Sequence, residues 1–197
     1  MPSATSPASA EPSVISVLKT LEQQMSALQK SPQRLQQPVA LIGPGDASAE
    51  LCAAAYQIAH HLARCGLSIV CGGRGGVMQA ASHGAFDAGG MVVGLLPEND
   101  TLTANPYLTV ALPTGMGEMR NALIARCSAC LVAVGGGMGT LSEIALGLKL
   151  GKAVFCLQPD FELPGATVVA DVDHAVTSVL TCLLNYRLKN SGADSVT

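Results

Sequence analysis

The sequence predicts an α/β protein with a doubly wound, mostly parallel, Rossmann-like sheet and an extra N-terminal helix. Continuous apolar segments alternate with amphipathic ones, as is typical of buried parallel strands joined by helices on both faces of the sheet. Hydrophobic residues make up 49% of the 197 residues, yet there is no Trp and only three Phe and three Tyr. We therefore expect one domain with a core of Ala, Val, Leu and Ile.

The first part of the chain lies outside this alternating pattern. We expect residues 1–37 to form a flexible tail and an amphipathic helix, residues 38–190 the Rossmann-like domain, and residues 191–197 a second tail. Ser13 is a candidate N-cap of the helix, which could pack either on its own domain or on a second subunit. The helix is predicted from one apolar stripe, formed by Val14, Leu18, Leu21, Met25 and Leu28.

After residue 38 the expected strands and helices follow in regular order. VALIG (39–43) is an apolar run that ends in glycine, as a buried strand does, and residues 48–65 carry apolar side chains at helical spacing. By the same two patterns, the further strands are 67–73, 91–97, 108–112, 130–136, 153–157 and 167–171. The further helices are 76–88, about 117–128, 140–150 and about 173–188.

Charge and cysteine usage argue against several classes of protein. The net charge of −3 disfavours a nucleic-acid partner, because such affinity depends largely on neutralising phosphates with Lys and Arg. It also disfavours a polybasic membrane anchor, and no apolar run approaches the roughly 20 residues of a membrane-spanning helix. The N-terminus lacks the basic and apolar regions of a secretory signal. Seven cysteines, an odd number, predict reduced, buried thiols and a cytoplasmic location.

Three of the expected strands end in glycine-rich turns that open helices: GPGDAS (43–48), GGRGGVM (72–78) and GGMGT (136–140). At this edge of a parallel sheet, glycine lets backbone N–H groups approach an anion, and helix N-termini add a partial positive charge. One such turn could need its glycines for the turn alone, but three favour a phosphate or other anion site, with Gly43 and Gly45 in the first turn. The spacing matches neither G-x-G-x-x-G nor a P-loop, which disfavours an ordinary NAD enzyme or ATPase.

Polar residues follow the third turn and precede it. Thr140 would lie in the first turn of a helix, where its hydroxyl can cap the helix, contact a phosphate, or do both. Glu143 has the T-x-x-E spacing of a capping box; alternatively, a carboxylate kept beside an anion site indicates chemistry. Arg120, in GMGEMRNALIAR (115–126), either reaches an anion bidentately or is a solvated helix residue.

Taken together, these segments resemble the Lonely Guy family, the cytokinin riboside 5′-monophosphate phosphoribohydrolases. GGGMGTLSE (135–143) matches the family signature P-G-G-x-G-T-x-x-E except at Gly135, where the family has Pro. Arg120 lies 23 residues before Glu143, as the family arginine does. CGGRGGVMQAASHGAFDAGGMVVGLLP (71–97) is similar to the family run G-G-G-x-x-G-L-M…G-G-x-V-x-G-V-x-P, so that the resemblance covers roughly residues 38–157.

The chain departs from this family upstream of the signature. Gly117 and Glu118 stand where the family has Met and His, and Asn121 stands in place of Lys. Such departures resemble a sister subgroup that includes the molybdenum cofactor carrier proteins, which share the fold and the glycine turns and bind a phosphate-bearing pterin cofactor. They argue against cytokinin substrates, whereas the retained Arg120 and Glu143 leave hydrolysis open.

The resemblance implies two different functions. In the first, the protein hydrolyses the N-glycosidic bond of a nucleoside 5′-monophosphate to the free base and ribose 5-phosphate, with Glu143 and Arg120 as catalytic residues and no metal or cofactor. In the second, it is a non-catalytic molybdenum cofactor carrier or nucleotide sensor, and the molybdenum cofactor is its cargo. The implied ligand-binding residues are Gly136, Gly137, Gly139 and Thr140 around the phosphate, and Gly72, Gly73 and Met78 on the neighbouring wall.

The expected partners follow from these two functions. They are a small molecule, either a nucleotide or a pterin phosphate, and further copies of the chain in a homodimer or larger homo-oligomer. Neither nucleic acid nor a membrane is expected, and the acidic charge disfavours a DNA-processing protein of the same superfamily. The sequence leaves open which base or ligand is bound and whether there is turnover.

Overall fold

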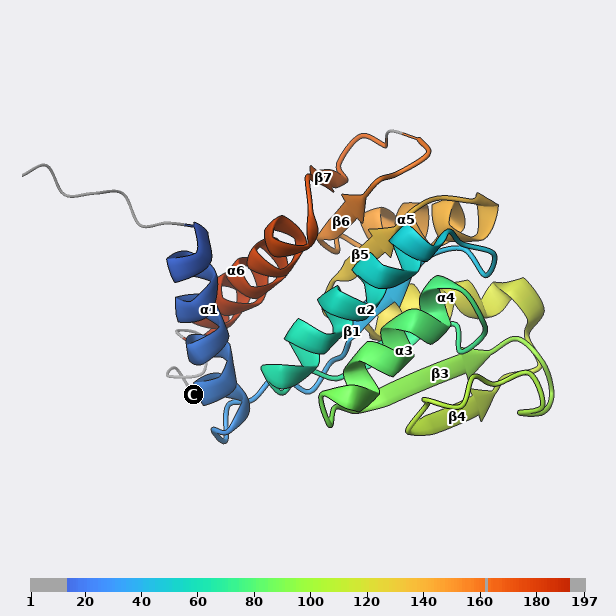
Figure 1. Ribbon diagram of the computed structural model, residues 1–197, viewed down its shortest axis with the longest axis horizontal. Coiled ribbons are helices and arrows are strands. Elements are labelled where there is room, and N and C mark those ends of the chain that lie inside the picture. Colours follow the sequence, from blue (N-terminus) through green and yellow to red (C-terminus); the bar gives the residue numbers. More distant parts are fainter. Residues whose placement is uncertain (1–13, 162, 192–197) are drawn as a thin grey trace, which may run out of the picture.

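The computed structural model describes residues 14–161 and 163–191, and it confirms the doubly wound α/β fold (Figure 1). The strands, in chain order, are β1 (Val39–Ile42), β2 (Ile69–Cys71), β3 (Val92–Leu96), β4 (Val110–Pro113), β5 (Leu131–Val134), β6 (Val154–Leu157) and β7 (Thr167–Val169). They form one seven-stranded sheet in the order β4-β3-β2-β1-β5-β6-β7, and every neighbouring pair is parallel.

The helices differ from the sequence expectation mainly at their ends. They are α1 (Val14–Gln29), α2 (Ala49–Arg64), α3 (Val77–Asp87), the 3-10 helix η1 (Gly117–Arg120), α4 (Asn121–Cys127), α5 (Met138–Lys149) and α6 (Val172–Ser191). The helix expected over 140–150 already begins at Met138, and the one expected over 117–128 is divided into η1 and α4. Ser191, expected in the C-terminal tail, ends α6, and residues 192–197 lie outside the described part of the chain.

Side chains of the central strands alternate between two cores. On β1, Val39 and Leu41 belong to one core, whereas Ala40 and Ile42 belong to the other. Successive side chains of a strand point to opposite faces, so a strand buried on both faces requires a continuous apolar run. The first core includes residues of α2, α3 and α6, and the second includes residues of α4 and α5. The helices therefore cover both faces of the sheet, as Figure 1 shows.

The order of the strands places a crevice at the centre of the sheet. Strands β2, β3 and β4 are added on one side of β1, whereas β5, β6 and β7 are added on the other. At such a switch point the connections leave toward opposite faces, which opens a crevice beyond the carboxyl ends of the two strands. The first glycine turn begins there directly after Ile42, and the third follows Val134 after Gly135.

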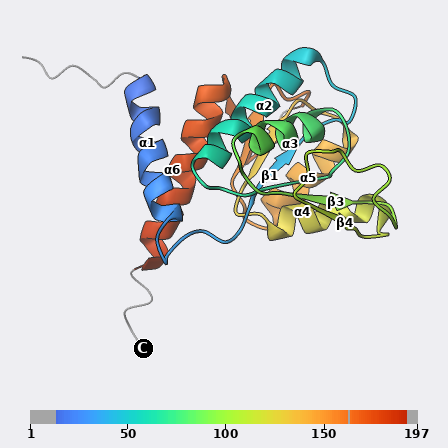
Figure 2. The ribbon, with the colours of Figure 1, turned by 60° about the horizontal axis from the view of Figure 1, so that its bottom comes forward.

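Helix α1 packs beside α6 of the same chain (Figure 2). Four of its stripe residues lie in or against the first core: Leu18 and Met25 are buried, and Leu21 and Leu28 are half-buried. Glu22 Oε1 also lies 2.7 Å from His61 Nδ1 on α2. Of the two arrangements that the sequence left open, the structure shows packing on the helix's own domain. The expected N-cap Ser13 lies outside the described residues.

The cysteines form no disulfides. All seven are free thiols, and Cys127 is exposed at the end of α4, although the sequence suggested buried thiols throughout. Within residues 14–161 and 163–191, no three His, Cys, Asp or Glu side chains are grouped so that they could hold a metal ion. No helix in these ranges combines the length and the apolar character that crossing a membrane requires.

Candidate ligand-binding site

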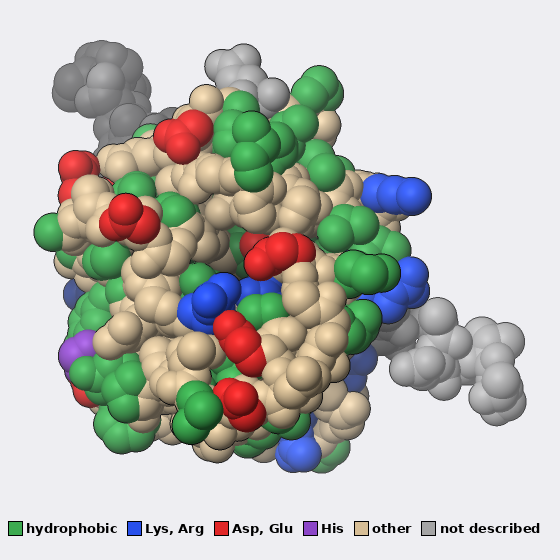
Figure 3. All heavy atoms as spheres, turned by 90° about the vertical axis from the view of Figure 1, so that its right-hand side faces the viewer, with side chains coloured by type: hydrophobic (Ala, Val, Ile, Leu, Met, Phe, Trp, Pro, Cys, Tyr) green, Lys and Arg blue, Asp and Glu red, His purple; other side chains and the backbone are tan. Residues whose placement is uncertain are grey.

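A cavity of about 490 Å³ lies at the carboxyl ends of β1, β2 and β5. Figure 3 shows this edge of the molecule, where acidic and basic side chains border a hollow. The cavity is lined by the three glycine turns, by the start of α5, and by residues of η1 and α4. Its volume falls within the roughly 300–1,000 Å³ that is typical of small-molecule sites.

Most of the site residues expected from the sequence line this cavity: Gly43, Gly45, Gly72, Met78, Arg120, Gly137, Gly139, Thr140 and Glu143. Gly73 and Gly136 are not part of its lining. A Cβ atom at Gly73 would lie 2.9 Å from the side chain of Leu96, and one at Gly136 would overlap the carboxylate of Asp160. We therefore attribute to these two glycines the close packing of their turns rather than contact with a ligand.

Helix α5 opens into the cavity without a side-chain cap. Its N-cap is Gly137, which adopts φ 126°, a conformation that favours glycine. The first hydrogen bond of the helix runs from Leu141 N to Gly137 O, so the N–H groups of Met138, Gly139 and Thr140 have no partner within the helix. Thr140 is thus the third residue of α5 and not its cap. The T-x-x-E capping box considered from the sequence does not form, and another role is needed for Glu143.

Gly72 is required by the position of Arg120. A Cβ atom at Gly72 would overlap Nη2 of Arg120 and would lie 2.6 Å from Sδ of Met78. The glycine after β2 therefore allows the guanidinium to lie across the floor of the cavity, against the backbone of the second turn. This contact explains a glycine that sequence analysis could relate only to an anion.

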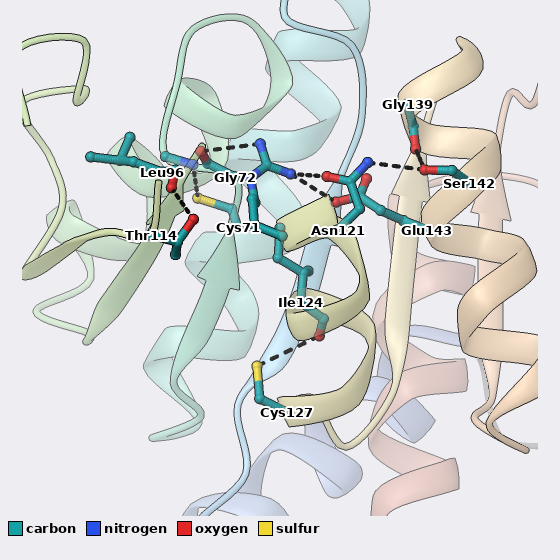
Figure 4. Close-up of polar contacts among 12 residues, drawn as sticks. Cys71, Gly72, Leu96, Thr114, Asn121, Ile124, Cys127, Gly139, Ser142 and Glu143 are labelled. Carbon is teal, nitrogen blue, oxygen red and sulfur yellow. Dashed lines mark hydrogen bonds and ion pairs between the residues drawn. The ribbon is translucent and has the colours of Figure 1, made fainter. Parts of the chain in front are cut away.

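Arg120 is buried, with 5% of its surface exposed, and is not the solvated helix residue of the alternative interpretation. Its Nη1 donates to Oδ1 of Asn121 and lies 3.5 Å from Oε1 of Glu143, and its Nη2 donates to the carbonyl of Gly72 at 3.4 Å (Figure 4). Asn121 Nδ2 in turn donates to Ser142 Oγ at 2.9 Å. Asn121 therefore links the start of α4 to α5 and helps to orient the guanidinium.

Burial determines the protonation of Glu143. The pKa of this carboxyl is raised from 4.5 to about 8, mainly by burial; Arg120 lowers the pKa by less than burial raises it, and the charge of Glu118 contributes to the increase. Arg120 is the one polar partner that the carboxylate has among the described residues. At pH 7 the side chain is therefore mainly a neutral acid beside a charged guanidinium, and it does not cancel the positive charge of Arg120.

This shift predicts a specific pH dependence of stability. The folded protein keeps on Glu143 a proton that the unfolded chain releases, in the window between pH 4.5 and about 8. Relative to the Glu143→Gln variant, the wild-type free energy of unfolding should be highest below this window and fall through it, by up to about 1.4 kcal/mol per pH unit. Urea denaturation of both proteins across this range measures the difference. If the free energies of unfolding of the two proteins changed with pH in the same way, Glu143 would not be protonated in the folded protein at pH 7.

Some residues of the cavity were not identified as site residues from the sequence. Arg74 lines the cavity, and its Nη2 lies 3.3 Å from Oε1 of Glu98. Glu118 and Asn121 were noticed only as departures from a family pattern, yet both line the cavity. Their closeness to Arg120 in the chain, at the start of a helix on the ligand edge, was the signal that could have identified them.

Comparison with known proteins agrees with this arrangement. The model of the SLOG cluster4 family matches residues 36–182. The chain belongs to the SLOG cluster4 family. The match includes every strand of the sheet and every residue that lines the cavity, and it leaves out α1.

Relatives of this SLOG protein differ in how much of it they match. An uncharacterized protein of Archaeoglobus fulgidus is 39% identical over 138 residues, which are 70% of this chain and 91% of the relative. The cytokinin riboside 5′-monophosphate phosphoribohydrolase LOG of Oryza sativa subsp. japonica is 35% identical over 95 residues, which are 46% of this chain and 39% of the rice protein. The resemblance to Lonely Guy proteins is thus confirmed, over less than half of the chain.

Solved structures match the SLOG domain more completely. The molybdenum cofactor binding protein from Rippkaea orientalis is 31% identical, with a TM-score of 0.72, over 76% of this chain and 99% of that protein. The molybdenum cofactor carrier protein MCP from Chlamydomonas reinhardtii is also 31% identical, with a TM-score of 0.70 and the same coverage. These matches confirm the similarity to the carrier subgroup.

Proposed function

We propose that the protein binds a small molecule through its phosphate group, and that this molecule is the molybdenum cofactor, held as cargo without turnover. The observation that carries the proposal is the uncapped N-terminus of α5, which opens into the cavity. Its unpaired N–H groups and the positive end of the helix would converge on one anion. Thr140 adds a hydroxyl that forms no hydrogen bond within the described residues.

The remainder of the cavity suits a pterin ring attached to that phosphate. Met78 and Met138 line it and offer polarizable thioethers to a flat ring. Arg120 supplies a positive charge that the mainly neutral Glu143 does not cancel at pH 7, which favours an anionic ligand. The choice of the molybdenum cofactor over other phosphates is supported by the two solved structures, because both are named for this cofactor and match most of the chain.

Replacing Thr140 with Val tests the phosphate site. The variant keeps the shape of the side chain but removes a hydroxyl aimed at an anion, so we expect affinity for inorganic phosphate and for the molybdenum cofactor to fall by about 10- to 100-fold. Isothermal titration calorimetry measures both affinities. Thr167→Val, on the exposed start of β7, is the matched control and should bind as wild type does. Equal binding by both variants would exclude a contact between the Thr140 hydroxyl and the phosphate.

A second function is favoured by the buried pair of Arg120 and Glu143. In this function the protein hydrolyses a nucleoside 5′-monophosphate, with the phosphate in the same place and Glu143 beside the ribose. Breaking the N-glycosidic bond develops oxocarbenium character at the sugar, which a nearby carboxylate stabilises. Assays of free base and ribose 5-phosphate with a panel of nucleoside 5′-monophosphates distinguish the two functions. Release of base supports hydrolysis, whereas cofactor binding without release supports a carrier.

Two further expectations from the sequence stay predictions. One is assembly into a homodimer or larger homo-oligomer, and the other is a cytoplasmic location. The proposals above require neither, because every residue they use belongs to one chain.

A further inference from the structure

We propose that Glu118 recognises the 2-amino-4-oxopyrimidine edge of the ligand's ring, and so selects a pterin or a guanine over other bases. The inference rests on the proposed binding of a phosphate-bearing ligand in the same cavity. It goes further because it names the side chain that would bind the ring of that ligand.

Glu118 is a carboxylate without a cation of its own. The cavity lining contains the arginines Arg74 and Arg120, and each lies within ion-pair distance of another carboxylate. Arg74 pairs with Glu98 at 3.3 Å, and Arg120 pairs with Glu143 at 3.5 Å. The exposed side chain of Glu118 forms no ion pair or hydrogen bond with any residue of the described ranges. Its oxygens are therefore available to accept hydrogen bonds from a ligand.

Glu118 and the phosphate site belong to different elements of the fold. It lies on η1, between β4 and α4, whereas the anion site is formed by the start of α5. Both elements border the same cavity, so a ligand whose phosphate lies at Gly139 and Thr140 can extend its ring toward η1. A phosphate beside Glu118 itself would be repelled, since both groups are negative. The cavity thus offers backbone N–H donors for an anion at the start of α5, and a carboxylate that can accept hydrogen bonds on η1.

Few ring systems present the donors that a carboxylate requires. The 2-amino-4-oxopyrimidine ring has a ring N–H directly beside an exocyclic amino group, and these two parallel donors match the two oxygens of a carboxylate, as a guanidinium does. Guanine and pterin share this edge. Hypoxanthine has only the ring N–H, and adenine and cytosine place an acceptor beside their amino group. Glu118 would therefore distinguish ligands by the amino group at position 2.

GMP and IMP test this prediction, because they differ only in that amino group. We expect wild-type protein to bind GMP at least about tenfold more tightly than IMP, as one charge-assisted hydrogen bond implies. In the Glu118→Gln variant the ratio of the two affinities should fall to about twofold or less. The ratio of the GMP and IMP affinities is compared, and not each affinity alone, because removing a negative charge will strengthen the binding of every anion. Glu50→Gln, an exposed carboxylate of α2 outside the cavity lining, makes the same charge change and should keep the wild-type ratio.

The outcomes separate this inference from the proposed function. Equal binding of GMP and IMP by wild type, or an unchanged ratio in Glu118→Gln, overturns the role of Glu118 and leaves the phosphate site standing. No binding of GMP, IMP or 6-hydroxymethylpterin phosphate overturns the phosphate site itself, and the inference with it. Where the GMP/IMP ratio falls in Glu118→Gln, the role of Glu118 is supported, and the relative affinities of the pterin phosphate and GMP then show which of the two rings the cavity prefers.

Discussion

Replacing Glu143 with Gln is expected to lower any release of base from nucleoside 5′-monophosphates by about 100- to 10,000-fold, the range that one catalytic carboxyl group commonly contributes. The amide has nearly the same shape but cannot carry the negative charge that stabilises a developing oxocarbenium ion. Because burial raises the pKa of Glu143 to about 8, the charged form becomes abundant only near that pH. Wild-type kcat/KM, which reports the ionisation of the free enzyme, should therefore rise with pH up to about 8 and then level off.

Binding of inorganic phosphate provides the control for this variant. The N–H groups at the start of α5 and the hydroxyl of Thr140 remain in place, so phosphate affinity should survive the change. A variant that releases base as fast as wild type would exclude Glu143 from the chemistry. If wild type released base from no nucleotide and yet bound the cofactor, Glu143 would only line the binding site of a carrier as a neutral side chain.

Replacing Arg120 with Met is expected to destabilise the protein by up to about 3–5 kcal/mol, as for other buried ion pairs that lose one partner. The change leaves Glu143 in a buried position without a cation, and it also removes the donors to Gly72 and Asn121. The loss should be larger at pH 9 than at pH 6, because a neutral carboxyl tolerates burial and an ionised one does not. Urea denaturation at the two pH values measures this difference.

A double variant distinguishes the effect of the unpaired Glu143 charge on stability from the effect of losing the packing of Arg120. If the unpaired carboxylate causes the loss, Arg120→Met combined with Glu143→Gln should recover most of the stability lost at pH 9. Arg126→Met, on the exposed side of α4, is the matched control and should change stability by about 0.5 kcal/mol or less. A loss that is the same at both pH values and in the double variant would show that Arg120 acts through packing alone.

The sequence was sufficient to predict the fold because its pattern is local. A strand buried on both faces needs a continuous apolar run, and VALI at β1 and LVAV at β5 are such runs, each followed by glycine. The helices between them carry apolar side chains on one face. These patterns depend on residues a few positions apart, so reading along the chain detects them. The order in which the strands join the sheet depends on packing between distant segments and was known only from the structure.

The sequence by itself determined that three glycine turns meet at one edge of a parallel sheet, near Arg120 and Glu143. Only the tertiary structure decided how these residues are used. Thr140 is inside α5 because Gly137 adopts φ 126° and starts the helix earlier, which frees Glu143 from a capping role. Arg120 is buried because Gly72, far from it in the chain, leaves room for its guanidinium. Contacts of this kind join side chains that no local pattern relates, and burial between them also raises the pKa of Glu143 to about 8.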